Sequence, residues 1–183
     1  MAPAAERYPF ELRQLAELTP AHSLGSMSEY TPKEDGWAYG IGAEGMLRLG
    51  SLVYVGLGLS VSAMHGKSTG MQDQTIEPPE ISGWLWQLPL VLELGFPNVE
   101  WGRFSVGAEL GVVNASVKNM YYRAEDRGGT FTYDAPFLGL RLGYVHWLSD
   151  RIGVVLNSGV RLSVEDTWIY SSLGVRLGVS WRL

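Results

Sequence analysis

The amino-acid sequence predicts an all-β fold, an eight-stranded antiparallel up-and-down transmembrane β-barrel. Three observations support this prediction. From Trp37 to the end of the 183-residue chain, apolar residues alternate with small or polar ones at a period of two. Beyond the first expected strand, the charged residues of these stretches fall on the face that is rich in Gly and Ser. The tryptophans lie near the ends of the stretches, as in the aromatic bands of membrane barrels.

The alternation divides the chain, taken as one domain over residues 1–183, into eight expected strands. The first strand depends on Tyr8, Phe10 and Leu12, and its end, the sequence LAEL, could also form a helical turn. With this strand included, both ends of the chain come to the same end of the barrel. The expected strands are 7–17, 36–49, 51–65, 83–96, 101–115, 131–148, 151–163 and 168–183.

Connections of two kinds alternate along the chain. Tight turns are expected at 49–51, 96–100 and 149–151. Long polar connections are expected at 19–35, 66–82 and 116–130, and the short segment 164–167 lies on the same side. Short turns at one end and long loops at the other are typical of an up-and-down barrel.

The face of Gly and Ser is expected to point into the barrel, and the face of Leu, Val and Ile toward lipid. An eight-stranded barrel is narrow, so large inward side chains must alternate with very small ones. Glycine on a water-facing wall would weaken the strands without a packing reason. If the barrel were inverted, the apolar face would line a lipocalin-like pocket and the protein would be a soluble carrier.

Glutamate and arginine are expected inside the barrel as a buried ion-pair network. The guanidinium group pairs with carboxylates in bidentate geometry and is less strongly hydrated than an ammonium group. The lysines, and the aspartates apart from Asp134, fall in the expected loops and turns. The expected network comprises Glu11, Arg13, Glu44, Arg48, Glu93, Arg103, Glu109, Arg141, Arg161 and Arg176.

Arginine outnumbers glutamate on the inward face when Arg182 is included, although Glu17 is a further candidate acid. A water-filled lumen with this excess would form a narrow pore that favours anions. Side chains fill the lumen of an eight-stranded barrel, and this geometry favours a salt-bridged plug over a pore.

Aromatic residues are expected to form two girdles around an aliphatic band, as in transmembrane barrels. The girdle toward the long loops comprises Trp37, Tyr39, Trp84, Trp86, Phe131, Tyr133, Trp168 and Tyr170. The girdle toward the short turns comprises Tyr8, Phe10, Phe96, Trp101, Trp147 and Trp181.

Two prolines fit the expected strands badly. Pro89 lies in the middle of a strand and Pro136 near the start of another. Because proline cannot donate a ladder hydrogen bond, we expect an interrupted ladder or a bulge at each of them.

The composition excludes several classes of partner and cofactor. The net charge of −5 and the pI of about 5.2 argue against a nucleic-acid partner. The chain has no cysteine, so neither disulfides nor thiolate metal sites are expected. No group of His, Asp and Glu has the spacing of a metal site, so neither a metal nor another cofactor is expected.

The chain ends in RLGVSWRL, where the alternation continues to the last residue. This ending resembles the C-terminal assembly signal of bacterial outer-membrane barrels, with Arg176, Gly178, Trp181 and Leu183 at its polar, glycine, aromatic and final apolar positions. The wider pattern resembles the small OmpA/OmpX-type barrels. The resemblance implies recognition by the barrel-assembly machinery and a place in the outer membrane of a Gram-negative bacterium, in contact with its lipid. It also implies periplasmic termini, extracellular long loops and pairing of the last strand with the first.

One candidate function is a structural, adhesive or partner-binding role of the long loops, since loops on rigid scaffolds often carry function. Met120, Tyr121 and Tyr122 form an apolar cluster in a polar loop and are the candidate contact site with an extracellular or envelope protein. The alternative is that these three residues extend the girdle. The anion-leaning pore is a second candidate function.

A third candidate function is a lipid-modifying enzyme, which would need a nucleophile and a base near the membrane surface. His65 with Ser62 or Ser68 is the candidate pair, whereas His22 is expected alone in a loop. Because the spacing supplies no triad, we do not expect an enzyme and assign no catalytic residue.

Overall fold

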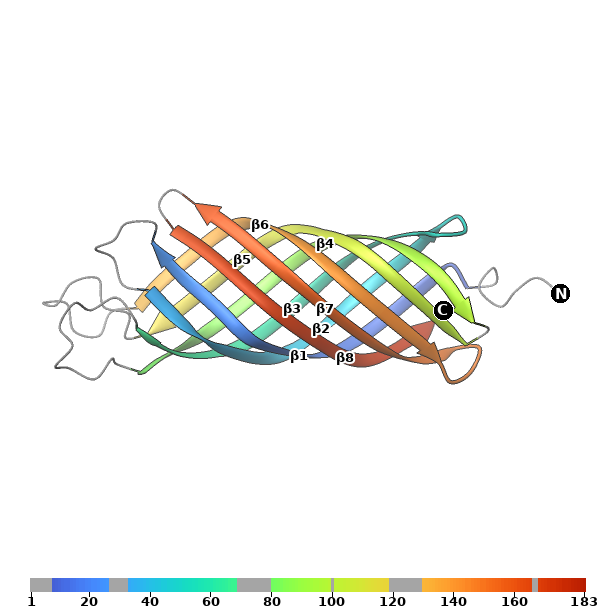
Figure 1. Cartoon of the computed structure of the whole chain (residues 1–183), viewed down its shortest axis with the longest axis horizontal. Helices are drawn as coiled ribbons and strands as arrows, with labels where there is room; N and C mark the ends of the chain where they lie inside the picture. The colour runs from blue at the N-terminus through green and yellow to red at the C-terminus, as the bar shows by residue number, and fades with distance from the viewer. Residues whose placement is uncertain (1–7, 27–32, 69–79, 100, 119–129, 166–167) are drawn as a thin grey trace, which may run out of the picture.

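The computed structural model is a closed barrel in which eight antiparallel strands follow one another in chain order (Figure 1). It describes residues 8–26, 33–68, 80–99, 101–118, 130–165 and 168–183. No helix in these ranges is long and apolar enough to cross a membrane. The strands are β1 (Phe10–Ser26), β2 (Lys33–Leu49), β3 (Val53–Ser68), β4 (Glu80–Val99), β5 (Gly102–Lys118), β6 (Thr130–Trp147), β7 (Ile152–Glu165) and β8 (Trp168–Arg182).

Side chains alternate between the interior and the outer wall, and the apolar face is outside. In β6, Leu138 and Leu140 are 61% and 63% exposed, whereas Arg141 is 3% exposed. The same alternation holds along most of β6, where buried and exposed residues follow each other one by one. An apolar exterior around a charged interior defines a transmembrane barrel, so the predicted fold class is confirmed.

The strands extend further toward the long loops than expected. β1 continues to Ser26 and β2 begins at Lys33, so the connection expected over 19–35 is much shorter and His22 belongs to β1. The loops expected over 66–82 and 116–130 are also shortened, because β3 to β6 are longer at this end. Lys33, Asp35, Lys67 and Lys118, expected in loops, consequently lie within strands.

The first and last strands close the barrel. β1 pairs with β8 from Glu11 opposite Arg182 up to Ser26 opposite Trp168. The final residue takes part, since Leu183 N donates to Phe10 O at 2.9 Å. Glycine is required at 178 because a Cβ there would overlap the backbone of Gln14. The pairing of β8 with β1 therefore closes the barrel.

Pro89 is accommodated by an interruption in the β3–β4 ladder. The described pairs stop at Leu57 opposite Leu90 and resume at Ser60 opposite Gln87. A Cβ at Gly58 would lie 2.9 Å from Pro89 Cγ, so glycine leaves room for the proline ring. The expected interruption is thus present, and Gly58 is the residue that makes it compatible with packing.

Pro136 marks the point where β6 and β7 separate. The described pairing between these strands begins at Phe137 opposite Ser163. On its other side, β6 pairs with β5 over its whole length, from Thr130 opposite Lys118. The side chain of Ser163 donates from Oγ to the carbonyl oxygen of Pro136. Proline is tolerated here because no backbone donor is required toward β7.

Candidate functional site

The centre of the barrel is an ion-pair network around Arg141 of β6. Its guanidinium group binds Glu44 of β2 in bidentate geometry, with Nη1 to Oε1 at 2.8 Å and Nη2 to Oε2 at 3.0 Å. Arg141 Nε also donates to Glu93 Oε1 of β4 at 2.8 Å, and Nη1 to Glu109 Oε1 of β5 at 3.2 Å. One side chain therefore links β6 with three other strands across the interior.

A second layer lies toward the short turns. Arg13 of β1 binds Glu93 through two hydrogen bonds of 2.9 and 3.0 Å. Arg103 of β5 binds Glu11 through two hydrogen bonds of 2.5 and 2.9 Å, and its guanidinium lies 4.0 Å from the ring centroid of Tyr54. Tyr54 brings β3 into the interior packing.

A third layer lies toward the long loops. Arg161 of β7 donates from Nε to Glu109 Oε2 at 2.6 Å and from Nη1 to Glu17 Oε1 at 3.0 Å, and it also binds Gln87. Arg176 of β8 donates from Nη1 to Glu44 at 3.0 Å and to Glu109 at 3.1 Å. Each carboxylate in this layer thus meets an arginine from another strand.

The ion-paired network within the described residues is balanced in charge. It contains five arginines (Arg13, Arg103, Arg141, Arg161, Arg176) and five glutamates (Glu11, Glu17, Glu44, Glu93, Glu109). Two of the arginines expected on the inward face are not among these five. Arg48 lies near the end of β2, and its Nη2 donates to Ser51 O in the turn that follows, at 3.3 Å. Arg182 places its guanidinium 3.5 Å from the ring centroid of Trp147 at the terminal end.

Glycines next to the network leave room for its large side chains. A Cβ at Gly107 would lie 3.0 Å from Glu93 Cγ and 3.2 Å from Arg141 Cγ. The interior is therefore filled by large charged residues packed against the smallest ones.

An apolar cap closes the interior above the network, toward the long loops, and the sequence analysis missed it. Tyr133 and Phe137 of β6 are each 2% exposed, and Phe137 lies 5.5 Å from the guanidinium of Arg161. The signal was the period of two itself, because these residues share the odd-numbered face of Arg141. The cap comprises Leu24, Ala38, Met64, Ile81, Leu85, Val113, Ala115, Val117, Phe131, Tyr133, Ala135, Phe137 and Tyr170.

Four of the aromatic residues that were expected in the two girdles lie inside the barrel instead. Phe131, Tyr133 and Tyr170 are buried inside the barrel, and so is Trp147 at the opposite end. These residues were assigned to the outer wall because they lie near strand ends. The alternation of side chains along each strand, however, determines which face they occupy. The aromatic side chains that do face outward include Phe10, Trp37, Tyr39, Trp84, Trp86, Phe96 and Trp101, while the side chain of Trp168 lies outside the described set.

Beyond the aromatic residues, the outer wall of β5 and β6 becomes polar while the interior stays apolar. Thr132 and Asp134 are exposed on β6, next to Ser116 and Asn114 of β5. Val113, Ala115 and Val117 point inward between them. This inverted pattern is that of a barrel wall in water, so this end projects beyond the lipid.

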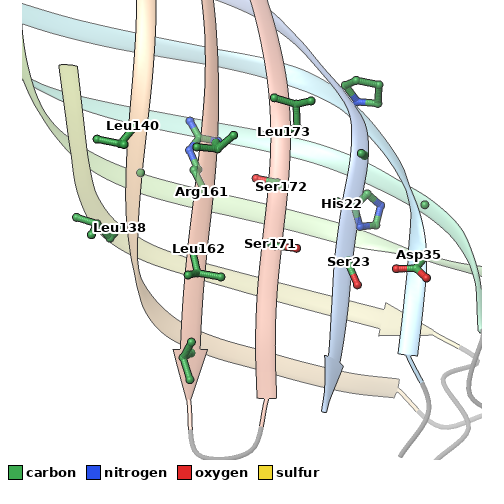
Figure 2. A pocket seen from close by; sticks show the side chains of 16 residues that line it. His22, Ser23, Asp35, Leu138, Leu140, Arg161, Leu162, Ser171, Ser172 and Leu173 are labelled. Atoms are coloured by element: carbon green, nitrogen blue, oxygen red, sulfur yellow. The ribbon is translucent and has the colours of Figure 1, made fainter. Parts of the chain in front are cut away.

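An apolar hollow lies across β6, β7, β8, β1 and β2 (Figure 2). Leu138, Leu140, Leu162 and Leu173 line one part, and His22, Ser23 and Asp35 lie at the other (Figure 2). It has a volume of about 850 Å³ and lies just below the separation of β6 from β7.

Two cavities inside the network are far smaller, at about 10 Å³ each. One is lined by Asn157, Arg161 and Arg176, the other by Glu17, Gly58 and Pro89. Such a volume holds about one water molecule. Around these two cavities the interior is filled with side chains.

Of the two candidate catalytic pairs, His65 and Ser62 are not brought together. Ser62 is buried inside the barrel, whereas His65 stacks on the outer wall against Trp37 at 4.9 Å and Tyr39 at 5.8 Å between ring centroids. The side chain of Ser68 is outside the described set. His22, expected in a loop, is a residue of β1, and its side chain is buried. The candidate contact site Met120, Tyr121 and Tyr122 lies outside the described residues.

The residues of the expected assembly signal lie along the closing strand. Arg176 points into the network, and Gly178 lies against β1. Trp181 is half-buried, and Leu183 is 61% exposed.

No family model matches the chain, and no curated protein matches it. Among solved structures it is similar to the outer membrane protein OprG from Pseudomonas aeruginosa, with a TM-score of 0.66 and 11% identity over 95% of each chain. It is also similar to Neisserial surface protein A, with a TM-score of 0.56, 14% identity, and coverage of 96% of this chain and 97% of the other. A third similar structure is the outer membrane protease OmpT from Escherichia coli, with a TM-score of 0.51, 8% identity, and coverage of 95% and 96%.

These similarities confirm that the fold is that of Gram-negative outer-membrane β-barrels. The same architecture serves different activities, so the function has to be argued from the interior and the surface of this chain.

Proposed function

We propose that this chain is a closed barrel of the bacterial outer membrane that does not conduct ions and acts by binding a partner at its long-loop end. The observation that supports this most strongly is the filled interior. A charge-balanced network of five arginines and five glutamates lies beneath an apolar cap. An ion crossing the lumen would have to break buried pairs and then cross the cap, and both steps are costly.

The proposed orientation has the long loops outside the cell and both termini in the periplasm. The polar outer wall of β5 and β6 supports this, because a structured end that projects beyond lipid is suited to external contacts. In the proposed assembly, the machinery that builds outer-membrane barrels recognises the last strand through Gly178, Trp181 and Leu183. Outer-membrane lipid covers the Leu- and Val-rich wall.

The proposed role is non-enzymatic. Among the described residues, His65 and Ser62 lie on opposite faces of β3, so a direct proton transfer between them is prevented. Partner binding needs no such pair, and the projecting end offers a rigid scaffold for loops.

Single-channel recording in planar bilayers tests the closed interior. The parent protein is expected to give no conductance steps. Glu44→Gln removes the charge of one of the two carboxylates that Arg141 and Arg176 share, and steps should then appear. The matched control is Glu80→Gln, because Glu80 is exposed on the outer wall. Steps in the parent protein would contradict the proposal.

A further inference from the structure

A further apolar hollow lies on the outer wall, across β8, β1, β2 and β3, which are neighbours in the barrel (Figure 1). Its volume is about 660 Å³. Ala16 of β1 and Gly42 and Ala43 of β2 line it, together with the larger side chains of Ile41 and Leu177. Small residues allow two membrane-embedded surfaces to approach closely, so this hollow suits contact with another protein wall.

One polar side chain lies in this hollow. Gln14 of β1 lines it and is exposed on the outer wall. Its partners in the sheet are Ala43 of β2 and Val179 of β8, and the next outward residue of its own strand is Ala16. Among the described residues, the amide of Gln14 has no hydrogen-bond partner. An amide with two donor hydrogens and an acceptor oxygen is thus placed in an apolar wall.

Gln14 lies at the depth of the hydrocarbon and not at the membrane surface. Phe10, one of the outward aromatic residues at the terminal end, precedes it by four residues on the same strand. Four residues of an antiparallel strand span about 13 Å, and with a strand tilt of roughly 40° about 10 Å of this span lies along the barrel axis. Water does not hydrate a lipid-facing side chain at this depth, so an unpaired amide is costly there.

We infer that two copies of this chain pack against each other through this hollow, with Gln14 of one copy hydrogen-bonded to Gln14 of the other. The amide is self-complementary, because its N–H donates to the oxygen of an identical amide while its own oxygen accepts. A two-fold axis along the membrane normal brings the same residue of both copies together and keeps both inserted in the same direction. This interface goes beyond the proposed function and lies apart from the long-loop end.

Lipid is a poor partner for this position. A hydrocarbon tail can pack against the apolar lining, but it has no group that donates to an amide or accepts from it. Ser158 of β7 is also exposed on the outer wall, but its position differs in chemistry. A short serine hydroxyl can bond to a nearby backbone group of its own chain, whereas the amide of Gln14 has several groups to pair. A second copy supplies the matching donor and acceptor at once.

Förster resonance energy transfer between donor-labelled and acceptor-labelled copies in phosphatidylcholine vesicles tests the inference. Asp150→Cys at an exposed turn gives one labelling position, because the chain has no cysteine of its own. Energy transfer should rise with the protein-to-lipid ratio along a monomer–dimer curve. Gln14→Leu should weaken the dimer by about tenfold, because it removes the amide pair. The matched control Ser158→Leu changes a polar residue elsewhere on the outer wall and should leave the curve unchanged.

A second pair of variants locates the interface. Ala16→Phe fills the hollow beside Gln14 and should weaken the dimer, whereas Ala108→Phe adds the same ring to the outer wall of β5 and should not. A shift in gel mobility on heating shows that each variant is folded before it is measured.

Three results would overturn the inference. The first is energy transfer that does not rise with protein density, as expected if lipid alone fills the hollow. The others are equal dimerisation by Gln14→Leu and the parent protein, and an equal loss in Ala16→Phe and Ala108→Phe. Conductance is measured separately, so failure of the closed-barrel proposal is distinguishable from failure of this one.

Discussion

Gly58 of β3 faces the pyrrolidine ring of Pro89 on β4, and a Cβ at position 58 would lie 2.9 Å from Pro89 Cγ and 3.3 Å from Glu44 Cγ. A proline, which has no backbone N–H to donate, thus lies beside a glycine, at the one described break in the β3–β4 ladder. The pair allows an otherwise disruptive residue to lie in the middle of a closed barrel.

Gly58→Ala should therefore destabilise the barrel by about 1–3 kcal/mol, the usual cost of overpacking. The measurement is the free energy of unfolding from urea titration in detergent micelles. Gly58→Ala combined with Pro89→Ala should recover part of the loss, since the ring is then gone. Gly174→Ala is the control, because its added Cβ would come no nearer than 3.3 Å to Thr19. Equal losses in both single variants would contradict the account.

Arg141→Met should destabilise the barrel by about 3–5 kcal/mol, because it takes from the buried carboxylates Glu44 and Glu93 one of the two arginines that contact them both. The same urea titration measures this change. Arg151→Met, at an exposed turn, should leave the midpoint nearly unchanged. A small effect of Arg141→Met would show that the network is not a structural unit.

Phe137→Ala should cost about 3–5 kcal/mol, since it opens a cavity in the apolar cap and removes the ring beside Arg161. The neighbouring change Leu138→Ala affects a side chain that is 61% exposed on the outer wall. Its loss of unfolding free energy should be clearly smaller. If the two variants behave alike, residue 137 is not part of a packed interior.

The sequence predicts which face of each strand is inside, but not which interior residues meet. Alternation places Arg13 and Glu93 inward. Their bidentate pairing across the barrel depends on the stagger of strands that are far apart in the sequence. Glu17 joins the network for the same reason, although the sequence LAEL could also have formed a helical turn.

The apolar cap could have been predicted from the sequence. Phe131 and Tyr133 follow the inward parity of Arg141, but their position near a strand start resembles that of girdle residues. Parity along the strand and position near its end give different answers wherever strands extend beyond the lipid, because the apolar face of the strand then points inward. The break between β6 and β7 could not be placed from Pro136 alone, since it depends on where β7 ends.

Quenching of tryptophan fluorescence by brominated lipids tests most directly which face of the barrel meets the membrane. The chain has seven tryptophans, so the variants retain one each and carry phenylalanine elsewhere. Trp84, 61% exposed on the outer wall, should be strongly quenched, whereas Trp147, 4% exposed inside the barrel, should be protected. Strong quenching of Trp147 together with protection of Trp84 would contradict a barrel with an apolar exterior and a charged interior.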